Sequence, residues 1–332
     1  MSNPKERRFN SYSRYFRELL GGRVQKVTIN AGFGCPNRDG TLAVGGCTFC
    51  LNEAFTPSYC QPTKTITRQI DEGVEFHARR YRKAERYLAY FQSFSNTYAP
   101  LEELRRIYDE ALAHPLVAGI VVGTRPDCVD EAKLDYFAEL ARSHYVALEY
   151  GIESTFDATL RAVNRRHDFA AARRAVEMTA ERAEALSVAR ASEAFSSVPG
   201  CGLHIGAHFI LGFPGETPEM LLAQTDVINS LPLTTVKFHQ LQIFRGTAMA
   251  DEYERSPEKF RFWNTPEEYI DFFIEILRRL RPSLVVERFA GEAPPRHRVG
   301  EGWGPVRNET LLAMLERRLE QLDARQGDMY VK

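Results

Sequence analysis

The chain has 332 residues, with 43 Lys and Arg against 44 Asp and Glu, so its formal net charge is −1. This balance argues against a globally basic nucleic-acid binder but leaves room for a local basic face. Its 44% hydrophobic and 26% charged residues are typical of a globular protein. No apolar run approaches the ~18 residues of a membrane span, and the polar, basic start lacks an apolar signal segment. We therefore expect a cytoplasmic protein with no membrane partner.

Strand-like and helix-like segments alternate along the chain. Apolar or β-branched runs predict strands at residues 24–30, 84–94, 116–125, 145–154, 203–216 (with its loop) and 235–244. Amphipathic periodicity predicts helices at 10–22, 64–83, 100–114, 129–143, 156–186 and 217–231. The strand at 116–125 is almost wholly apolar, as in a parallel sheet buried on both faces. Six such units predict an α/β fold.

Two stretches depart from this rhythm. Residues 180–200 are rich in Ser and Ala and longer than a helix-to-strand link needs, so we interpret them as an insertion or an extended helix. The tail adds a helix at 267–280, a strand at 283–290, a Gly/Pro loop and a last helix at 308–324. We expect three parts: a helical extension (1–23), an α/β core (24–250) and an α/β extension (251–332).

Three cysteines cluster after the first strand. Cys35, Cys47 and Cys50 have the spacing Cys-x11-Cys-x2-Cys, in a loop rich in turn-forming residues. A structural zinc site normally takes four ligands, and the fourth is missing locally. An iron–sulfur cluster needs four thiolates if every iron is to be closed, so three would leave one iron open. A disulfide framework is not expected from six cysteines in a chain this long.

The cysteine loop resembles that of a known family. CPNRDGT followed by GGCTFC is similar to the cluster loop of the radical S-adenosylmethionine (SAM) superfamily. It is most similar to a bacterial subfamily related to the Elongator-catalytic-subunit and methylthiotransferase branch, and the resemblance covers nearly the whole chain. The resemblance implies a partial (β/α)6 barrel of TIM type. It also implies a [4Fe–4S] cluster on Cys35, Cys47 and Cys50, with SAM on the open iron.

The resemblance assigns further residues to SAM. Phe49 would pack on the adenine, the alternative being a loop aromatic that only shields the cluster. Gln92 and Ser93 begin a segment that matches FQ-x-x-x-NTYAP, which in relatives lies at the SAM amino group. A run of polar and aromatic residues after a strand can also be an ordinary loop.

The end of the fourth expected strand offers hydrogen-bonding groups. Glu153 and Ser154 could bind ribose hydroxyls. The following Asn-Arg-Arg-His sequence at 164–167 resembles an Asn-Arg-Gly-His of relatives, and Arg165 would pair with the SAM carboxylate, for which its fork is suited. Arg166 replaces the usual glycine, which leaves the local backbone and the role of His167 open. The alternative is a solvated basic helix.

The fifth expected strand ends in ILGFPGE, which resembles a segment against which adenine lies, so Ile210 and Gly212 would contact SAM. On the sixth, His239 is the candidate substrate contact or proton donor, although a lone strand histidine is more often a core residue. His208, Lys237 and Gln242 could also point into the barrel. A second pattern of the family, Arg-x-x-Gly-x-x-Pro, is matched by Arg288, Gly291 and Pro294 without a known role. Cys60, Cys128 and Cys201 are expected to be core or free thiols.

The resemblance also implies a reaction and partners. A flavodoxin- or ferredoxin-type donor would supply one electron, and SAM cleavage would give methionine and a 5′-deoxyadenosyl radical that abstracts a substrate hydrogen. Near relatives modify tRNA, and the subfamily is linked to conversion of a carboxymethylaminomethyl group of the wobble uridine into aminomethyl. Local basic clusters could neutralise RNA phosphates: residues 79–86, 161–174, 278–281 and 296–298. The alternatives are a small-metabolite or protein substrate, or a non-catalytic Fe–S or zinc protein.

Overall fold

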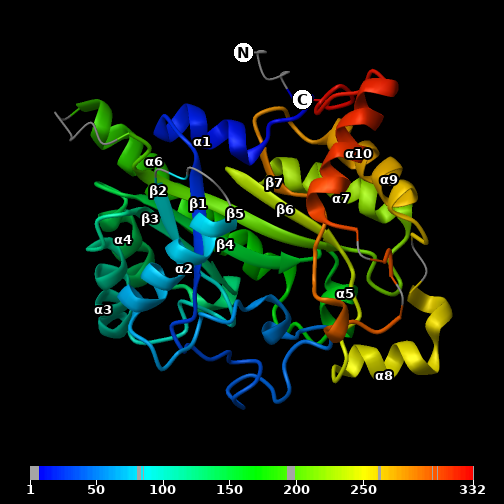
Figure 1. The fold of residues 1–332 in the computed structure, drawn as a ribbon, viewed down its shortest axis with the longest axis horizontal. Helices are drawn as coiled ribbons and strands as arrows, with labels where there is room; N and C mark the ends of the chain where they lie inside the picture. Colours follow the sequence, from blue (N-terminus) through cyan, green and yellow to red (C-terminus); the bar gives the residue numbers. More distant parts are fainter. Residues whose placement is uncertain are drawn as a thin grey trace.

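The computed structural model of the chain describes residues 7–80, 84, 86–192, 199–260, 263–300, 302–304 and 306–331. Its centre is a curled, all-parallel sheet whose strand order equals the chain order (Figure 1). The strands are β1 (Val24–Ile29), β2 (Arg86–Phe91), β3 (Val117–Thr124), β4 (Tyr145–Glu153), β5 (Gly202–Leu211), β6 (Thr235–Gln240) and β7 (Val285–Arg288). Each strand therefore pairs with its sequence neighbours, and β1 and β7 form the two edges of a half-barrel. The predicted fold class is confirmed.

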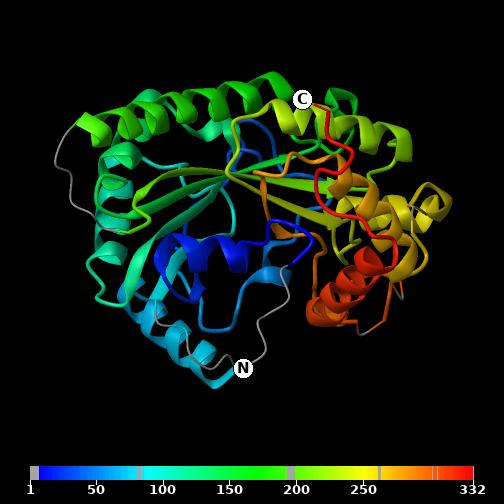
Figure 2. The same ribbon diagram turned by 90° about the horizontal axis from the view of Figure 1, so that it is seen from above.

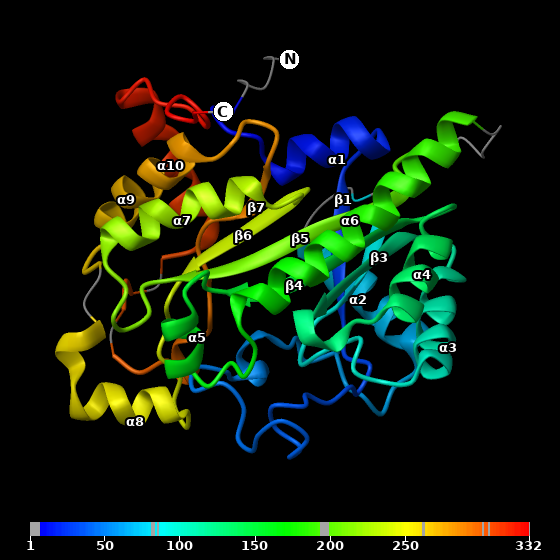
Figure 3. The ribbon, with the colours of Figure 1, turned by 180° about the vertical axis from the view of Figure 1, so that it is seen from behind.

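Helices cover the convex face of the sheet, as the view from above shows (Figure 2). They are α2 (Ile66–Arg80), α3 (Leu101–Leu112), α4 (Glu131–Leu140), α5 (Asp157–Ala162), α6 (Phe169–Ser192), α7 (Pro218–Ser230), α9 (Pro266–Arg279) and α10 (Asn308–Gln321). Figure 3 shows α6 lying across β4 and β5. Local sequence fixes several starts: the side chains of Asp130 and Thr217 accept from backbone N–H groups of the first turns of α4 and α7.

The amino-terminal helix α1 (Tyr12–Leu20) closes the interior of the half-barrel at the amino-terminal ends of the strands, at the top of Figure 1. Its buried residues Phe16 and Leu20 pack with inward-facing strand residues that include Leu88, Val121 and Tyr145. Gly21 ends the helix in the left-handed conformation (φ 72°), as the Gly-Gly pair predicted. The barrel interior is therefore sealed by apolar packing on the side opposite to the carboxyl ends of the strands.

Two predicted elements differ in the structure, and one observed helix was not predicted. The helix expected over 156–186 is broken into α5 and α6, because Asn164 and Arg166 adopt left-handed φ values of 55° and 64° that an α-helix cannot contain. The strand expected in the tail joins the main sheet as β7, so the sheet has seven strands and not six. Helix α8 (Ala248–Arg255) was not predicted. The expected insertion at 180–200 falls partly on residues 193–198, outside the described residues.

None of the helices in the described ranges is long and apolar enough to cross a membrane.

Candidate active site

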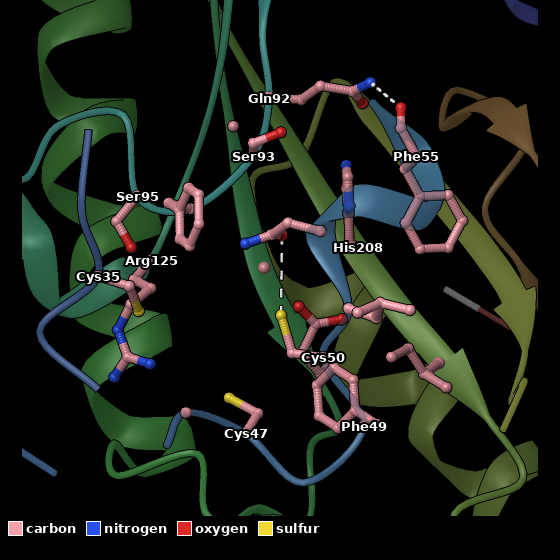
Figure 4. A pocket seen from close by; sticks show the side chains of 18 of the residues that line it. Cys35, Cys47, Phe49, Cys50, Phe55, Gln92, Ser93, Ser95, Arg125 and His208 are labelled. Atoms are coloured by element: carbon pink, nitrogen blue, oxygen red, sulfur yellow. Dashed lines mark hydrogen bonds between the residues drawn. The ribbon is translucent and has the colours of Figure 1, made fainter. Parts of the chain in front are cut away.

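The cysteine loop lies at the carboxyl ends of the strands (Figure 1), and a cavity opens there (Figure 4). Its wall combines residues that are far apart in the sequence. The residues that line it include Cys35, Arg38, Cys47, Phe49, Cys50, Phe55, Tyr90, Gln92, Ser93, Ser95, Arg125, Glu149, Glu153, Arg165, His208, Ile210, Lys237, His239, Gln242, Phe244, Arg288 and Gly291. Parallel strands collect their carboxyl ends at one edge, which is the usual place for active sites in such folds.

All three clustered cysteines line this cavity, and Figure 4 shows their side chains directed into it. The buried Asn37 holds the loop in place, since its side-chain amide donates to Asn164 O (2.6 Å) and to Cys47 Sγ (3.4 Å). The Arg38 guanidinium donates to Cys50 O (2.8 Å). Burial and the neighbouring Cys47 raise the pKa of the Cys50 thiol, while Arg38 acts in the opposite direction. Among the described cysteines none forms a disulfide.

Gly46 shows why the loop sequence carries a glycine before Cys47. Its φ is 86°, in the left-handed region, and a Cβ at this position would lie 2.8 Å from Arg38 Nε. A side chain would therefore displace the guanidinium that braces the loop.

Buried hydrogen-bonding atoms without a protein partner surround the cysteines. Within the described part of the chain, these include Arg125 Nη1, Arg165 Nε and Ser95 Oγ. Buried polar atoms are rarely left unpaired, so donors around three thiols fit an anionic group such as a thiolate-bound cluster or a carboxylate. No three His, Cys, Asp or Glu side chains in the described residues converge as a single metal ion would require. A cubane cluster instead places its ligands on different irons.

Arg165 is buried beside the cysteines. Its Nη1 is 3.5 Å from Cys47 Sγ and its Nη2 is 3.7 Å from Glu153 Oε1, and it also donates to Gly151 O. Burial disfavours its charge, but Cys47 and Glu153 together raise its pKa. The guanidinium is thus a fixed cation beside the cysteines, and the expected alternative of a solvated basic helix does not apply to it.

The loop after β2 is held in a strained conformation. Ser93 and Phe94 have φ values of 85° and 61°, which cost free energy for residues other than glycine. The buried Asn96 maintains the loop, because its side-chain amide donates to the carbonyls of Phe91, Ser93 and Gly123. The carbonyl groups of this loop are thereby ordered at the cavity.

Gln92 and Ser93 both line the cavity, yet their side chains also brace it. Gln92 Nε2 donates to Phe55 O (3.1 Å) and to Thr28 Oγ1 (3.3 Å), while Ser93 Oγ is 3.0 Å from Thr56 Oγ1. The Gln92 contact with Phe55 is drawn in Figure 4. The predicted SAM contact of this segment stays a prediction, and the geometry favours its backbone carbonyls over these two braced side chains.

Glu153 and Ser154 have different environments. Glu153 lines the cavity with φ at 71°. Ser154 is not in the lining: it is 1% exposed and its hydroxyl donates to Glu216 Oε1 (2.6 Å). This geometry argues against a ribose contact by Ser154, because its hydroxyl connects β4 to the loop after β5. Of the two residues, Glu153 is the one left as a candidate for the ribose contact. Burial raises the pKa of Glu216.

The residues predicted to contact the adenine form an apolar wall. Phe49 packs on Phe213 with ring centroids 5.3 Å apart, and both belong to a cluster with Val163, Ile210 and Met249. Phe49 and Ile210 line the cavity, as expected. Gly212 does not line it: this residue faces a neighbouring hollow between β6 and α8, so the geometry does not bring it to the predicted contact.

His239 lines the cavity but is a neutral side chain. Burial, followed by the charge of Arg288, lowers its pKa to about 3. Its Nδ1 is 3.3 Å from Gln240 O, which favours a proton on Nδ1 and leaves Nε2 as an acceptor. The predicted role of His239, a substrate contact or a proton donor, stays a proposal. His167 does not line the cavity, and burial lowers its pKa to about 3 as well.

An ion network forms the floor of the cavity, and the sequence analysis missed most of it. Lys26 Nζ is 2.6 Å from Glu149 and 2.8 Å from Glu287, and Lys237 Nζ is 2.5 Å and 2.9 Å from the same carboxylates. His208 Nε2 is 3.1 Å from Glu149 Oε2. Burial opposes the charge on Glu149, but Lys237 and Lys26 hold its pKa well below the usual range. A charge inside an otherwise apolar strand was the available signal.

The basic clusters expected to bind RNA are partly used within the protein. Arg281 donates to the carbonyls of residues 229, 231 and 233, and burial lowers its pKa. Arg278 and Arg279 both pair with Glu275. In the first cluster, residues 81–83 lie outside the described residues. Around α5 and the start of α6, three arginines stay exposed: Arg161, Arg166 and Arg174.

The fold and the site define a class of protein: a parallel half-barrel with a three-cysteine loop and clustered buried donors at the carboxyl ends of its strands. The family model described as the Radical SAM superfamily matches residues 29–223, and the Radical_SAM C-terminal domain matches residues 233–321. The chain therefore belongs to the radical SAM superfamily, and its cofactors are a [4Fe–4S] cluster and SAM.

Several known proteins are similar to this chain. It is 31% identical over 330 residues to the uncharacterized Bacillus subtilis protein YtqA, covering 98% of this chain and 94% of that one. It is 34% identical over 275 residues to Escherichia coli YhcC, covering 82% and 80%. The structure of an archaeal Elp3 from Methanocaldococcus infernus has the same fold, with a TM-score of 0.64 at 15% identity, covering 91% of this chain and 64% of that one.

Proposed function

We propose that this protein is a radical SAM enzyme in which Cys35, Cys47 and Cys50 hold the cluster and the cavity admits the substrate. When bound, the cluster and SAM supply reductive cleavage to a 5′-deoxyadenosyl radical. The observation that carries the proposal is the convergence of three cysteines with unpaired buried donors of Arg125, Arg165 and Ser95 on one cavity.

The chain's own residues bind and orient SAM and the substrate, and shield them from water. Phe49 and Ile210 provide an apolar surface for the adenine, Glu153 accepts from ribose hydroxyls, and Arg165 is available to a carboxylate. On the far side of the floor, the apolar packing of α1 closes the cavity at the amino-terminal ends of the strands. This packing limits the access of water to a reactive intermediate. A flavodoxin- or ferredoxin-type protein supplies the electron.

We propose tRNA as the substrate, with maturation of the wobble uridine from carboxymethylaminomethyl to aminomethyl as the reaction. The support is the resemblance of the cysteine loop to a subfamily linked to this step, together with a fold shared with Elp3. The exposed arginines of α5 and α6 could contact phosphates near the cavity.

Two experiments test the proposal at separate levels. Anaerobically reconstituted protein should release methionine and 5′-deoxyadenosine when dithionite is added, and failure to do so would remove the radical SAM function. Nucleoside mass spectrometry of tRNA from a strain lacking the protein should show the carboxymethylaminomethyl nucleoside accumulating and the aminomethyl products missing. Unchanged tRNA with active SAM cleavage would instead favour a small metabolite or a protein as substrate.

A further inference from the structure

Most of the cationic side chains in the cavity lining have at least one protein partner, although Arg125 Nη1 and Arg165 Nε remain unpaired beside the cysteines. Arg38 donates to Cys50 O, Arg125 forms a double hydrogen bond with Asp127, and Lys237 lies between two carboxylates. Arg165 is held by Glu153 and Gly151. The remaining cation in the lining is Arg288, for which the structure records no hydrogen bond or ion pair with the described residues.

Arg288 is positioned by the last strand of the sheet. It stands in register with Lys237 at the end of β7, in the cavity wall that also contains His239 and Gln242. Gly291, three residues later, exchanges two hydrogen bonds with the side-chain amide of Gln240 (2.9 and 3.1 Å) and accepts from Gln242 (2.9 Å). A Cβ on Gly291 would be 3.1 Å from His239 Cβ. The Arg-x-x-Gly pattern thus builds one polar wall of the cavity.

The nearby acids do not neutralise Arg288. The floor contains two lysines and two glutamates that pair with one another at 2.5–2.9 Å, so it has no net charge of its own. Glu287, the sequence neighbour of Arg288, already accepts from both Lys26 and Lys237. His239, under the influence of burial and of Arg288, is neutral and adds no positive charge. The guanidinium of Arg288 is therefore a cation without an ion-pair partner among the described residues, beside acids that already pair with lysines.

We propose that Arg288 binds a carboxylate of the substrate. A planar guanidinium fork suits the two oxygens of one carboxylate, and Arg288 is the cation of this wall that has no carboxylate partner among the described residues. The proposal deepens the proposed function and rests on it for the identity of the ligand, the carboxylate that ends the carboxymethylaminomethyl side chain. Arg288 would then separate substrate from product, because the product has lost this group.

The test measures equilibrium binding of nucleosides to the anaerobic holoenzyme with SAM. The probes are 5-carboxymethylaminomethyluridine, its primary-amide analogue without the charge, and uridine 5′-monophosphate as a phosphate source. The variants are Arg288→Gln, Arg288→Lys and, as a matched control, Arg106→Gln on the outer face of α3, which is exposed and outside the cavity lining.

For the carboxylate probe, Arg288→Gln should lower affinity roughly tenfold to a hundredfold, the usual size for a hydrogen bond to a charged group. Arg288→Lys should retain part of the affinity, and Arg106→Gln should retain all of it. Affinity for the amide analogue should change less than threefold in every variant. Equal losses for carboxylate and amide, or no loss for either, would overturn the proposal, as would a loss confined to the monophosphate.

The outcome is independent of the tRNA assay. If wild-type protein binds the carboxylate probe through Arg288 but leaves tRNA unchanged, the tRNA function fails while the carboxylate site stands. If tRNA is converted and Arg288→Gln binds the carboxylate probe as tightly as wild type, the function stands and the site assignment fails.

Discussion

The two ends of the cavity differ in whether their buried polar side chains find partners within the protein. At the floor, Lys26, Lys237, Glu149 and Glu287 satisfy one another with contacts of 2.5–2.9 Å. At the cysteine end, the described residues leave buried atoms of Arg125, Arg165 and Ser95 without partners. The floor is a closed network, and the cysteine end is incomplete without a ligand.

Backbone strain follows the same division. Among the described residues other than glycine, six have positive φ values: Ser93, Phe94, Glu153, Asn164, Arg166 and Asp323. Apart from Asp323, they lie at the end of β4 (Glu153) or in loops next to the cysteines or the predicted SAM groups, and none belongs to the floor. Strained backbone and unpaired donors persist only where surrounding structure enforces them, which is typical of binding sites. The contrast assigns ligand binding to one end and stability to the other.

The largest effect should come from removing a cluster ligand. Cys47→Ala leaves two thiolates, so the reconstituted protein should lose its bound iron and sulfide and all detectable SAM cleavage. Iron and sulfide analysis with cluster absorbance provides the measurement. Cys201→Ala is the matched control, since Cys201 lies outside the cavity lining and should not alter cluster content. A full cluster in Cys47→Ala would show that the cysteine end is not the metal site.

Breaking the floor should instead reduce stability. Glu149→Gln leaves Lys237 and Lys26 short of one buried counter-charge, which typically costs about 3–5 kcal/mol. The free energy of unfolding, from denaturant titration, measures the loss. Glu252→Gln, which breaks an exposed pair with Lys259, should cost less than about 1 kcal/mol. Similar small losses in both variants would contradict the assignment of stability to the floor.

The Glu149→Gln variant should also change how the free energy of unfolding depends on pH. The pKa of Glu149 is held well below its usual range, burial opposing and Lys237 with Lys26 favouring the charged form. Its stabilising contribution is therefore complete above the unfolded pKa of about 4.3 and is lost as pH falls through the folded value. The difference in unfolding free energy between wild type and Glu149→Gln should shrink below about pH 4. A constant difference at all pH values would show that the charge is not the cause.

How far the sequence predicted the molecule depends on the range of the interactions involved. Apolar runs predicted six strands of the core because each run is a local pattern, and the position of the cysteines after the first strand predicted a site at its carboxyl end. Membership of β7 in the sheet could not be predicted, because its four residues gain their place by pairing with β6. The floor network was equally hidden, since Lys26, Glu149 and Glu287 come from three strands separated in the chain. Ser154 was misassigned because its partner, Glu216, belongs to another loop.

The smallest predicted effect concerns the strained end. Arg166 holds a φ of 64° where relatives were expected to have glycine, and a left-handed conformation costs a residue with a Cβ roughly 1–2 kcal/mol. Arg166→Gly should therefore raise the free energy of unfolding by about 1 kcal/mol, after the entropy that glycine adds to the unfolded chain.

Two further variants distinguish the effect of backbone strain on stability from the effect of the side chain. Arg166→Ala removes the guanidinium but keeps the Cβ, so it should give no stabilisation. Asn164→Gly also relieves a positive φ (55°), yet it removes a hydrogen bond of 2.8 Å from the Asn164 amide to Gly46 O in the cysteine loop, so it should not stabilise. If Ala at position 166 stabilises as much as Gly, the origin is repulsion among the basic residues of α5 and α6 and not the backbone. Backbone strain would then be limited to residues that directly face the cavity. The contrast between the cysteine end and the floor would become sharper.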